Sequence, residues 1–260
     1  MQNRYFGDVG DFGKYGLLRA LSGYWPEAPA LRLGVAWYLV PDEGHNDDGR
    51  HISYLMKPEY RTCDPELHDT LRRLLIEDGH PRKVDLVSRH GLLPPTTSYA
   101  ARPLDYANAQ SSMGRNRREG RLAYRAVWLE DTLARCADSD IVFLDPDNGF
   151  EVASTPKHAP KAPKYVYWDE FDRFANLGKT LVVYHHLNRT RPALDQVAAK
   201  TSEIRKRSPD LPEPIALLFR RGSLRCFFLL PAPAHHALID FRLKRMLAGA
   251  WSAHFERISS

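Results

Sequence analysis

The spacing of apolar residues predicts alternating helices and strands along most of the chain. Leu17, Leu18 and Leu21 share one face of a predicted helix over residues 12–22. The nearly continuous apolar run over residues 31–40 is typical of a strand that is buried on both faces. Further helices are predicted over residues 65–77, 117–137, 169–176, 192–207 and 235–247, and further strands over 84–87, 141–144, 180–185, 215–219 and 224–230, with a last extended segment over 251–258.

This alternation predicts a single α/β domain over residues 1–260, with a mainly parallel, doubly wound sheet and helices on both faces. Residues 92–117 contain three prolines and little periodicity, so we expect an irregular excursion there. Residues 154–164 contain three prolines and three lysines, which predicts a mobile loop rather than a domain linker. In such sheets ligands bind beyond the carboxyl ends of the strands, near the point where the strand order reverses.

The composition excludes chain-wide disorder and a membrane-spanning protein. Of the 260 residues, 43% are hydrophobic and 27% are charged, which is ordinary for a folded domain. The apolar runs are far shorter than the roughly 20 residues of a membrane-spanning helix, and the first residues lack the apolar segment of a secretory signal. Cys63, Cys136 and Cys226 form no close pair, which favours a reducing, cytoplasmic compartment. The net charge of +5 permits a nucleic-acid partner without requiring one, and nothing in the pattern indicates an oligomeric state.

Polar segments follow three predicted strands, and a fourth precedes the first predicted helix. They are the acidic loop over residues 41–50, Asp145-Pro146-Asp147-Asn148-Gly149, residues 184–189, and residues 7–15 with their three glycines. An unpaired carboxylate at the end of a buried strand is costly, which favours a function for Asp145, although the same five residues are a favourable turn sequence. His185 and His186 are expected to face opposite sides of their strand, so one core histidine and one solvated histidine is the alternative to a functional pair.

Basic residues cluster before and within the helix predicted over residues 117–137. Arg118, Arg121 and Arg125 recur at helical spacing and, together with Arg115, predict a positively charged stripe. Such a stripe attracts a nucleic-acid backbone, and nearby tyrosines offer rings on which bases stack. A solvated helix face and ordinary core packing are the alternative interpretations. The tyrosines are Tyr99, Tyr106 and Tyr124, and two further basic groups are Lys157, Lys161 and Lys164, and Arg220, Arg221 and Arg225.

Two of the polar segments resemble motifs of a known family. Residues 7–15 match the opening pattern G-N-x-A-D-x-x-K-H at Gly7, Asp11 and Lys14. The segment Asp145-Pro146-Asp147-Asn148 falls where the family has D-P-P-Y after its fourth strand. The first strand and the C-terminal strand, proline and helix fall in corresponding places. On these segments the chain resembles the bacterial ribosomal-RNA adenine-N6 methyltransferases of the J type.

The resemblance implies a Rossmann-like fold of the class I methyltransferase type, with S-adenosylmethionine as cofactor and an adenine in RNA or DNA as substrate. Asp145 and the Pro146 carbonyl would accept hydrogen bonds from the amino group that is methylated, and Asp147 and Asn148 would complete the catalytic motif. The residues implied to contact the cofactor are Gly7, Asp11, Lys14, Tyr15 and Asp42. Orientation of the amino group, rather than a strong base, would supply most of the rate.

Two departures from the family pattern keep other functions open. The loop over residues 41–46 is acidic where the family has a glycine-rich turn, and Asn148 stands where the family has an aromatic residue. Asp145 and Asp147, with His185 or His186, would suit a divalent metal in a phosphoesterase or nuclease. A third alternative is a nucleic-acid-binding protein that keeps the fold without catalysis.

Overall fold

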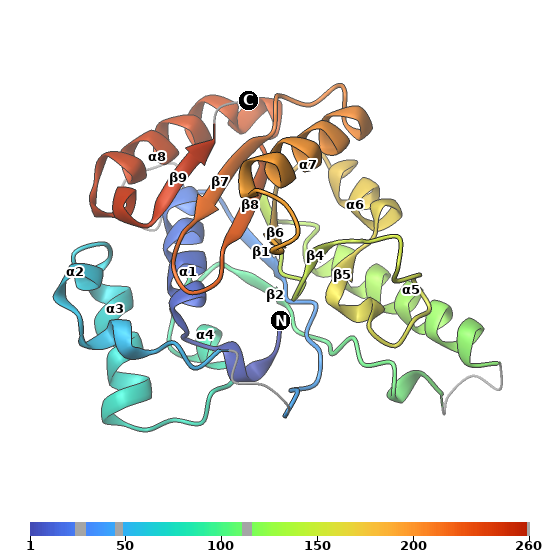
Figure 1. Ribbon diagram of the computed structural model, residues 1–260, viewed down its shortest axis with the longest axis horizontal. Helices are drawn as coiled ribbons and strands as arrows, with labels where there is room; N and C mark the ends of the chain where they lie inside the picture. Colours follow the sequence, from blue (N-terminus) through green and yellow to red (C-terminus); the bar gives the residue numbers. More distant parts are fainter. Residues whose placement is uncertain (24–29, 45–48, 111–115, 259–260) are drawn as a thin grey trace.

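A seven-stranded sheet forms the centre of the computed structural model, which describes residues 1–23, 30–44, 49–110 and 116–258. Across the sheet the strands are β2 (Ser98–Ala100), β1 (Leu33–Ala36), β3 (Ile141–Leu144), β6 (Thr180–His186), β8 (Arg225–Leu230), β7 (Ile215–Phe219) and β9 (Phe255–Ile258) (Figure 1). Five strands run in one direction, whereas β8 and β9 run in the other. The predicted α/β class with a mainly parallel sheet is therefore confirmed, and the arrangement is compatible with a Rossmann-like fold.

Helices fill most of the connections between these strands. They are α1 (Val9–Ser22), α2 (Pro58–Arg61), α3 (Pro65–Arg72), α4 (Leu86–Arg89), α5 (Arg117–Arg135), α6 (Trp168–Ala175), α7 (Ala193–Arg207) and α8 (His236–Ala248), and a π-helical turn (Arg73–Glu77) continues α3. A second, two-stranded parallel sheet pairs β4 (Gly149–Phe150) with β5 (Tyr165–Val166). Within the described ranges, none of these helices has the length and apolar character needed to cross a membrane.

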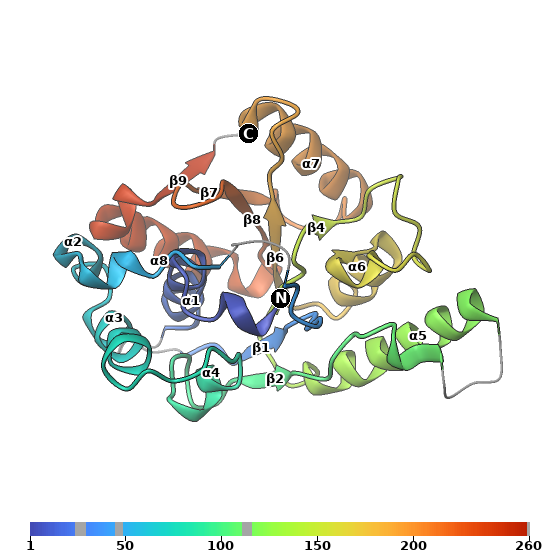
Figure 2. The ribbon, with the colours of Figure 1, turned by 60° about the horizontal axis from the view of Figure 1, so that its bottom comes forward.

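Two apolar cores lie on opposite sides of the main sheet, because successive strand residues point to opposite faces. In β6, Val182 and Tyr184 belong to one core, whereas Leu181 and Val183 belong to the other. Helices α1, α3 and α8 contribute to the first core, and α5, α6 and α7 contribute to the second. Figures 1 and 2 show these two groups of helices on either side of the strands. Both faces of the sheet are thus covered, as the near-continuous apolar strands predict.

The structure corrects three predictions of secondary structure. Residues 84–87 are not a strand, because α4 begins at Leu86. The excursion over residues 92–117 contains the edge strand β2, whose Ser-Tyr-Ala sequence carries little apolar signal. The strand predicted over residues 31–40 ends at Ala36, and Tyr38 beyond it has a φ of 46°, which interrupts extended backbone.

The loop over residues 154–164, rich in proline and lysine, is anchored by side chains. The Tyr167 hydroxyl donates to the Thr155 carbonyl at 2.7 Å, and the Tyr106 hydroxyl donates to the Lys157 carbonyl at 2.8 Å. Lys157 Nζ also pairs with Asp169 at 2.5 Å. These contacts connect the loop to neighbouring elements, and its mobility stays a prediction.

Helix α1 lies close against the sheet because glycines line the face that it turns toward β7. A side chain added at Gly13 would overlap Phe219, and one added at Gly16 would overlap Trp251. These two glycines thus admit aromatic side chains of the first core. The close approach holds the polar residues of α1 at the carboxyl edge of the sheet.

The strand order reverses between β1 and β3, since β2 lies on one side of β1 and β3 lies on the other. Ala36 and Leu144, the last residues of β1 and β3, are paired in register. In open α/β sheets the crevice beyond such a reversal is the usual ligand site. The chain that leaves β1 at residue 37 and β3 at residue 145 is therefore where a site is expected.

We expect Gly16→Ala to lower the free energy of unfolding by about 1–3 kcal/mol, because the added methyl group overpacks the contact with Trp251. Urea unfolding followed by circular dichroism measures the change. Gly44→Ala is the control, since no atom lies within 4 Å of a side chain placed there. Equal stability of the two variants would show that the contact between α1 and Trp251 accommodates the added methyl group.

Candidate active site at the carboxyl ends of β3 and β6

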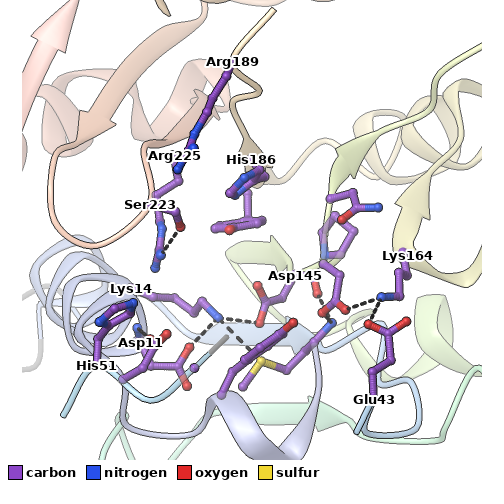
Figure 3. Close-up of a pocket in the computed structure, with 18 residues that line it drawn as sticks. Asp11, Lys14, Glu43, His51, Asp145, Lys164, His186, Arg189, Ser223 and Arg225 are labelled. Atoms are coloured by element: carbon purple, nitrogen blue, oxygen red, sulfur yellow. Dashed lines mark hydrogen bonds and ion pairs between the residues drawn. The ribbon is translucent and has the colours of Figure 1, made fainter. Parts of the chain in front are cut away.

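A pocket of about 430 Å³ opens beside the first turn of α1, at the carboxyl ends of β3 and β6 (Figure 3). It is strongly charged and carries carboxylates, amines and guanidinium groups. Its lining residues are Met1, Tyr5, Asp8, Asp11, Lys14, Glu43, Gly49, His51, Asp145, Pro146, Asp147, Asn148, Lys164, Tyr184, His186, Arg189, Ser223 and Arg225. The pocket lies where the reversal of strand order predicts a ligand site.

A buried ion-pair triad connects α1 to the end of β3. Lys14 Nζ lies 2.8 Å from Asp11 Oδ1 and 2.8 Å from Asp145 Oδ2, and all three side chains are at most 5% exposed. Burial alone lowers the pKa of Lys14, but the two carboxylates raise it well above its usual value, so the amine is charged. Burial raises the pKa of Asp145, and Lys14 offsets part of that rise. Tyr15 supports this triad by donating its hydroxyl to Asp11 Oδ2 at 2.8 Å.

A second cluster of charges joins the loops that follow β1 and β3. Asp147 Oδ1 lies 2.8 Å from the α-amine of Met1, and Asp147 Oδ2 accepts a hydrogen bond from Gln2 Nε2 at 2.7 Å. Lys164 Nζ pairs with Glu43 at 2.6 Å and lies 3.5 Å from Asp147. Burial raises the pKa of Asp147, but the Met1 amine, Gln2 and Lys164 together outweigh burial, so the pKa falls below its usual value. Asp147 is therefore an anion that fixes the loop carrying Glu43 against the turn after β3.

The structure brings most of the residues predicted for catalysis and cofactor binding into this pocket. Segments that are far apart in the sequence, around residues 11–14, 43 and 145–148, line the same cavity. The residues predicted for the catalytic motif, Asp145, Pro146, Asp147 and Asn148, are all among the lining residues, together with Asp11 and Lys14. The chemical roles assigned to them stay predictions.

Three residues predicted to contact a cofactor do not line the pocket. A side chain at Gly7 would overlap Leu75, so this glycine serves packing between α1 and the π-helical turn. Tyr15 is fully buried and acts through Asp11. Asp42 is exposed and accepts a hydrogen bond from a backbone N–H instead, whereas its neighbour Glu43 reaches the pocket. The prediction placed the right loop at the site but chose the wrong carboxylate, because the sequence cannot tell which of two adjacent side chains faces inward.

The predicted arginine stripe does not form one exposed surface. Arg115 lies outside the described residues, Arg118 is exposed, and Arg121 donates to the His158 carbonyl at 3.1 Å. Arg125 is buried and pairs with Glu170 at 2.5 Å. It lies one turn before the buried Trp128 and Leu129, so helical geometry turns this arginine toward the second core. The prediction that Arg125 contacts nucleic acid is therefore wrong.

The adjacent histidines separate as strand geometry predicts. His186 lines the pocket, whereas His185 is half-buried on the other face of β6, where its Nδ1 accepts a hydrogen bond from the Phe150 N–H at 3.2 Å. Burial, with a smaller contribution from Lys200, lowers the pKa of His185 to about 3. His185 therefore does not join Asp145 and Asp147 in one metal-ligand set. Among the described residues, no three side chains of His, Cys, Asp or Glu gather closely enough to hold a metal ion.

The sequence analysis missed the contribution of β8 to the pocket. Strand β8 runs antiparallel to β6 and pairs Arg225 with His186. Its first residues therefore return to the edge where the parallel strands end, and Ser223 and Arg225 join the lining. The direction of a strand is set by its neighbours, so its apolar pattern alone did not reveal this placement.

The sequence and the structure were compared with known proteins. No family model matches the sequence, no curated protein matches it, and no solved structure matches it.

The pKa of His185 leads to a pH dependence of stability. Because the folded value of about 3 lies below the unfolded value of about 6.5, the unfolded chain binds the extra proton between these pH values. Stability should then fall as the pH drops below 6.5, by up to about 1.4 kcal/mol per pH unit from this group. In urea titrations from pH 7 to pH 4.5, His185→Asn should lose less stability than the wild type, whereas the exposed His236→Asn should follow the wild type. Parallel curves for all three proteins would refute the assignment.

Proposed function

We propose that this protein is an S-adenosylmethionine-dependent methyltransferase that acts on an amino group of a nucleic-acid base, with adenine N6 as the leading candidate. The observation that carries the proposal is the position of Asp145-Pro146 at the carboxyl end of β3, inside a pocket next to the reversal of strand order. This is where the resemblance to the J-type methyltransferases places the groups that orient the target nitrogen.

The charge of the pocket suits a cofactor that carries a sulfonium and an ammonium group. Asp8 lines the pocket in addition to the carboxylates of the two clusters, and Asp8, together with Glu43 of the second cluster, would hold these cationic groups. Tyr5 and Tyr184 also line it and offer ring faces for a base. The volume of about 430 Å³ falls within the range of small-molecule sites.

The bound cofactor would supply an electrophilic methyl group, and the protein would supply orientation. Asp145 Oδ2 is held by Lys14, while no donor among the described residues reaches Asp145 Oδ1. We assign Oδ1 as the acceptor for one N–H of the target amino group and the Pro146 carbonyl as the acceptor for the other. Lys14 acts as a positioning residue, because its two ion pairs fix the carboxylate of Asp145 toward the pocket. Orienting the nitrogen lone pair in this way accounts for a large part of a methyl-transfer rate.

Asp145→Asn is expected to lower methyl transfer at least about 100-fold, because an amide cannot accept the target N–H as strongly as a carboxylate does. The assay follows radiolabelled methyl groups from S-adenosylmethionine into unmodified ribosomal RNA and into DNA. Asp140→Asn, just before the opposite end of β3, is the matched control and should keep full activity. Wild-type activity in Asp145→Asn, with an unchanged melting temperature, would remove Asp145 from the proposed role.

S-adenosylmethionine and S-adenosylhomocysteine should each raise the melting temperature, because a ligand that binds only the folded state stabilises it by mass action. A thermal-shift series with both ligands, and with Mn²⁺ and EDTA, tests this. A protein that responds to Mn²⁺ and cleaves phosphodiesters, but ignores both cofactors, would instead be a hydrolase. If the protein retains RNA in a salt-dependent way but responds neither to the two cofactors nor to Mn²⁺, it is a binding protein without catalysis.

A further inference from the structure

Arg225 is a buried cation for which the described residues provide no ion pair, although the charges of Asp8, Asp11 and Asp145 act on it from a greater distance. Its side chain lines the pocket although the residue is only 7% exposed. Its Nη2 donates to the Ser223 hydroxyl at 2.7 Å, but its buried Nε has no hydrogen-bond partner. Among the described residues, no carboxylate lies within ion-pair distance of its guanidinium group. A buried charge is costly unless it is paired, so this arginine calls for an anion from outside the chain.

The fold makes room for this guanidinium group at the start of α1. A side chain at Gly10 would overlap the Arg225 guanidinium. Because glycine has no side chain, the arginine can lie directly on the first turn of the helix. The amino end of a helix carries partial positive charge, which adds to the positive potential at this point. Asp8, the N-cap of α1, offsets part of this positive potential. The charges of Asp8 and Arg225 attract each other, since Arg225 opposes the rise in the pKa of Asp8 that burial causes.

Other donors surround the same end of the pocket. Ser223, His186 and Arg189 line it together with Arg225, and Figure 3 shows the four side chains gathered on one side of Asp145. Arg189 is exposed and has no ion-pair partner within the described part of the chain. Figure 3 shows Asp145 and Glu43, which pair with Lys14 and Lys164, away from this group of donors, whereas Asp11, the other partner of Lys14, lies below Ser223. An anionic group is thus attracted to the Arg225 end, whereas the charges at the Asp145 end are already paired with one another.

We propose that the Arg225 end of the pocket is a phosphate subsite, which holds a phosphate of the nucleotide whose base reaches Asp145. A guanidinium fork, a hydroxyl, an imidazole and a second guanidinium supply more donors than a planar carboxylate accepts, and they suit the several oxygens of a phosphate group. The assignment of this phosphate to nucleic acid rests on the proposed function, whereas the presence of an anion site rests on Arg225 alone. The subsite takes the place of the arginine stripe on α5 as the nucleic-acid contact.

The test compares ligands that differ only by a phosphate. By titration calorimetry, the wild type should bind adenosine 5′-monophosphate at least about 10-fold more tightly than adenosine, as expected for hydrogen bonds to a charged group. Arg225→Met should abolish this difference. Arg220→Met is the matched control, because Arg220 precedes β8 in the same hairpin but pairs with Glu256, and it should keep the difference. Equal affinities of the wild type for the two ligands would overturn the proposal.

Stability separates a ligand-binding role of Arg225 from a structural one. Because no carboxylate of the described residues forms an ion pair with Arg225, Arg225→Met should keep or raise the melting temperature in the absence of ligand. Inorganic phosphate, compared with chloride at equal ionic strength, should raise the melting temperature of the wild type but not of this variant. Ser223→Ala, a smaller change, should weaken binding of adenosine 5′-monophosphate severalfold with no loss of stability. A lower melting temperature of Arg225→Met, together with unaltered binding by Ser223→Ala, would make Arg225 a structural residue and overturn the subsite.

Further measurements distinguish a phosphate subsite from a site for the carboxylate of a cofactor, and test the subsite independently of the proposed function. If Arg225→Met weakens binding of L-methionine and leaves the preference for the monophosphate intact, the site holds a carboxylate and the phosphate assignment fails. If the wild type transfers no methyl group but its preference for the monophosphate depends on Arg225, the proposed function fails and the subsite stands. If methyl transfer occurs and Arg225→Met leaves the KM for RNA unchanged, the subsite fails and the proposed function stands.

Discussion

The buried ion pair between Lys14 and Asp145 is the interaction on which the site depends. It connects the first helix to the end of a central strand, 131 residues further along the chain. Neither charge is stable in the interior alone, and Asp11 supplies the second carboxylate that holds the amine. The pair therefore fixes the position of α1 at the carboxyl edge of the sheet and aims Asp145 at the pocket.

The packing of α1 on the sheet makes this ion pair possible. Glycines on one face of the helix let Phe219 and Trp251 approach the backbone, so the helix axis lies closer to the sheet than ordinary side chains would allow. The same row of glycines continues to Gly10, where it receives Arg225. One sequence feature thus serves the first core and the pocket at the same time.

The pocket separates its charges along its length. Lys14 and Lys164 are each paired with carboxylates, whereas Arg225 has none within the described residues. The charges around Lys14 and Lys164 are paired with one another, so this region suits the orientation of an uncharged group. The neighbouring Arg225 attracts an anion. This division is the physical basis for placing a target base near Asp145 and a phosphate near Arg225.

Apolar periodicity predicts the class of fold and most of the elements, because it reports which face of each helix and strand is buried. The pattern also indicates that the segments around Lys14, the loop after β1 and Asp145 meet, since the carboxyl ends of parallel strands share one edge. Three placements follow from the folded arrangement alone: Glu43 rather than Asp42 faces the pocket, Arg125 belongs to the core, and β8 returns Arg225 to the site. These outcomes depend on strand direction and on the rotation of each element about its own axis, which are set by contacts between distant parts of the chain rather than by local pattern.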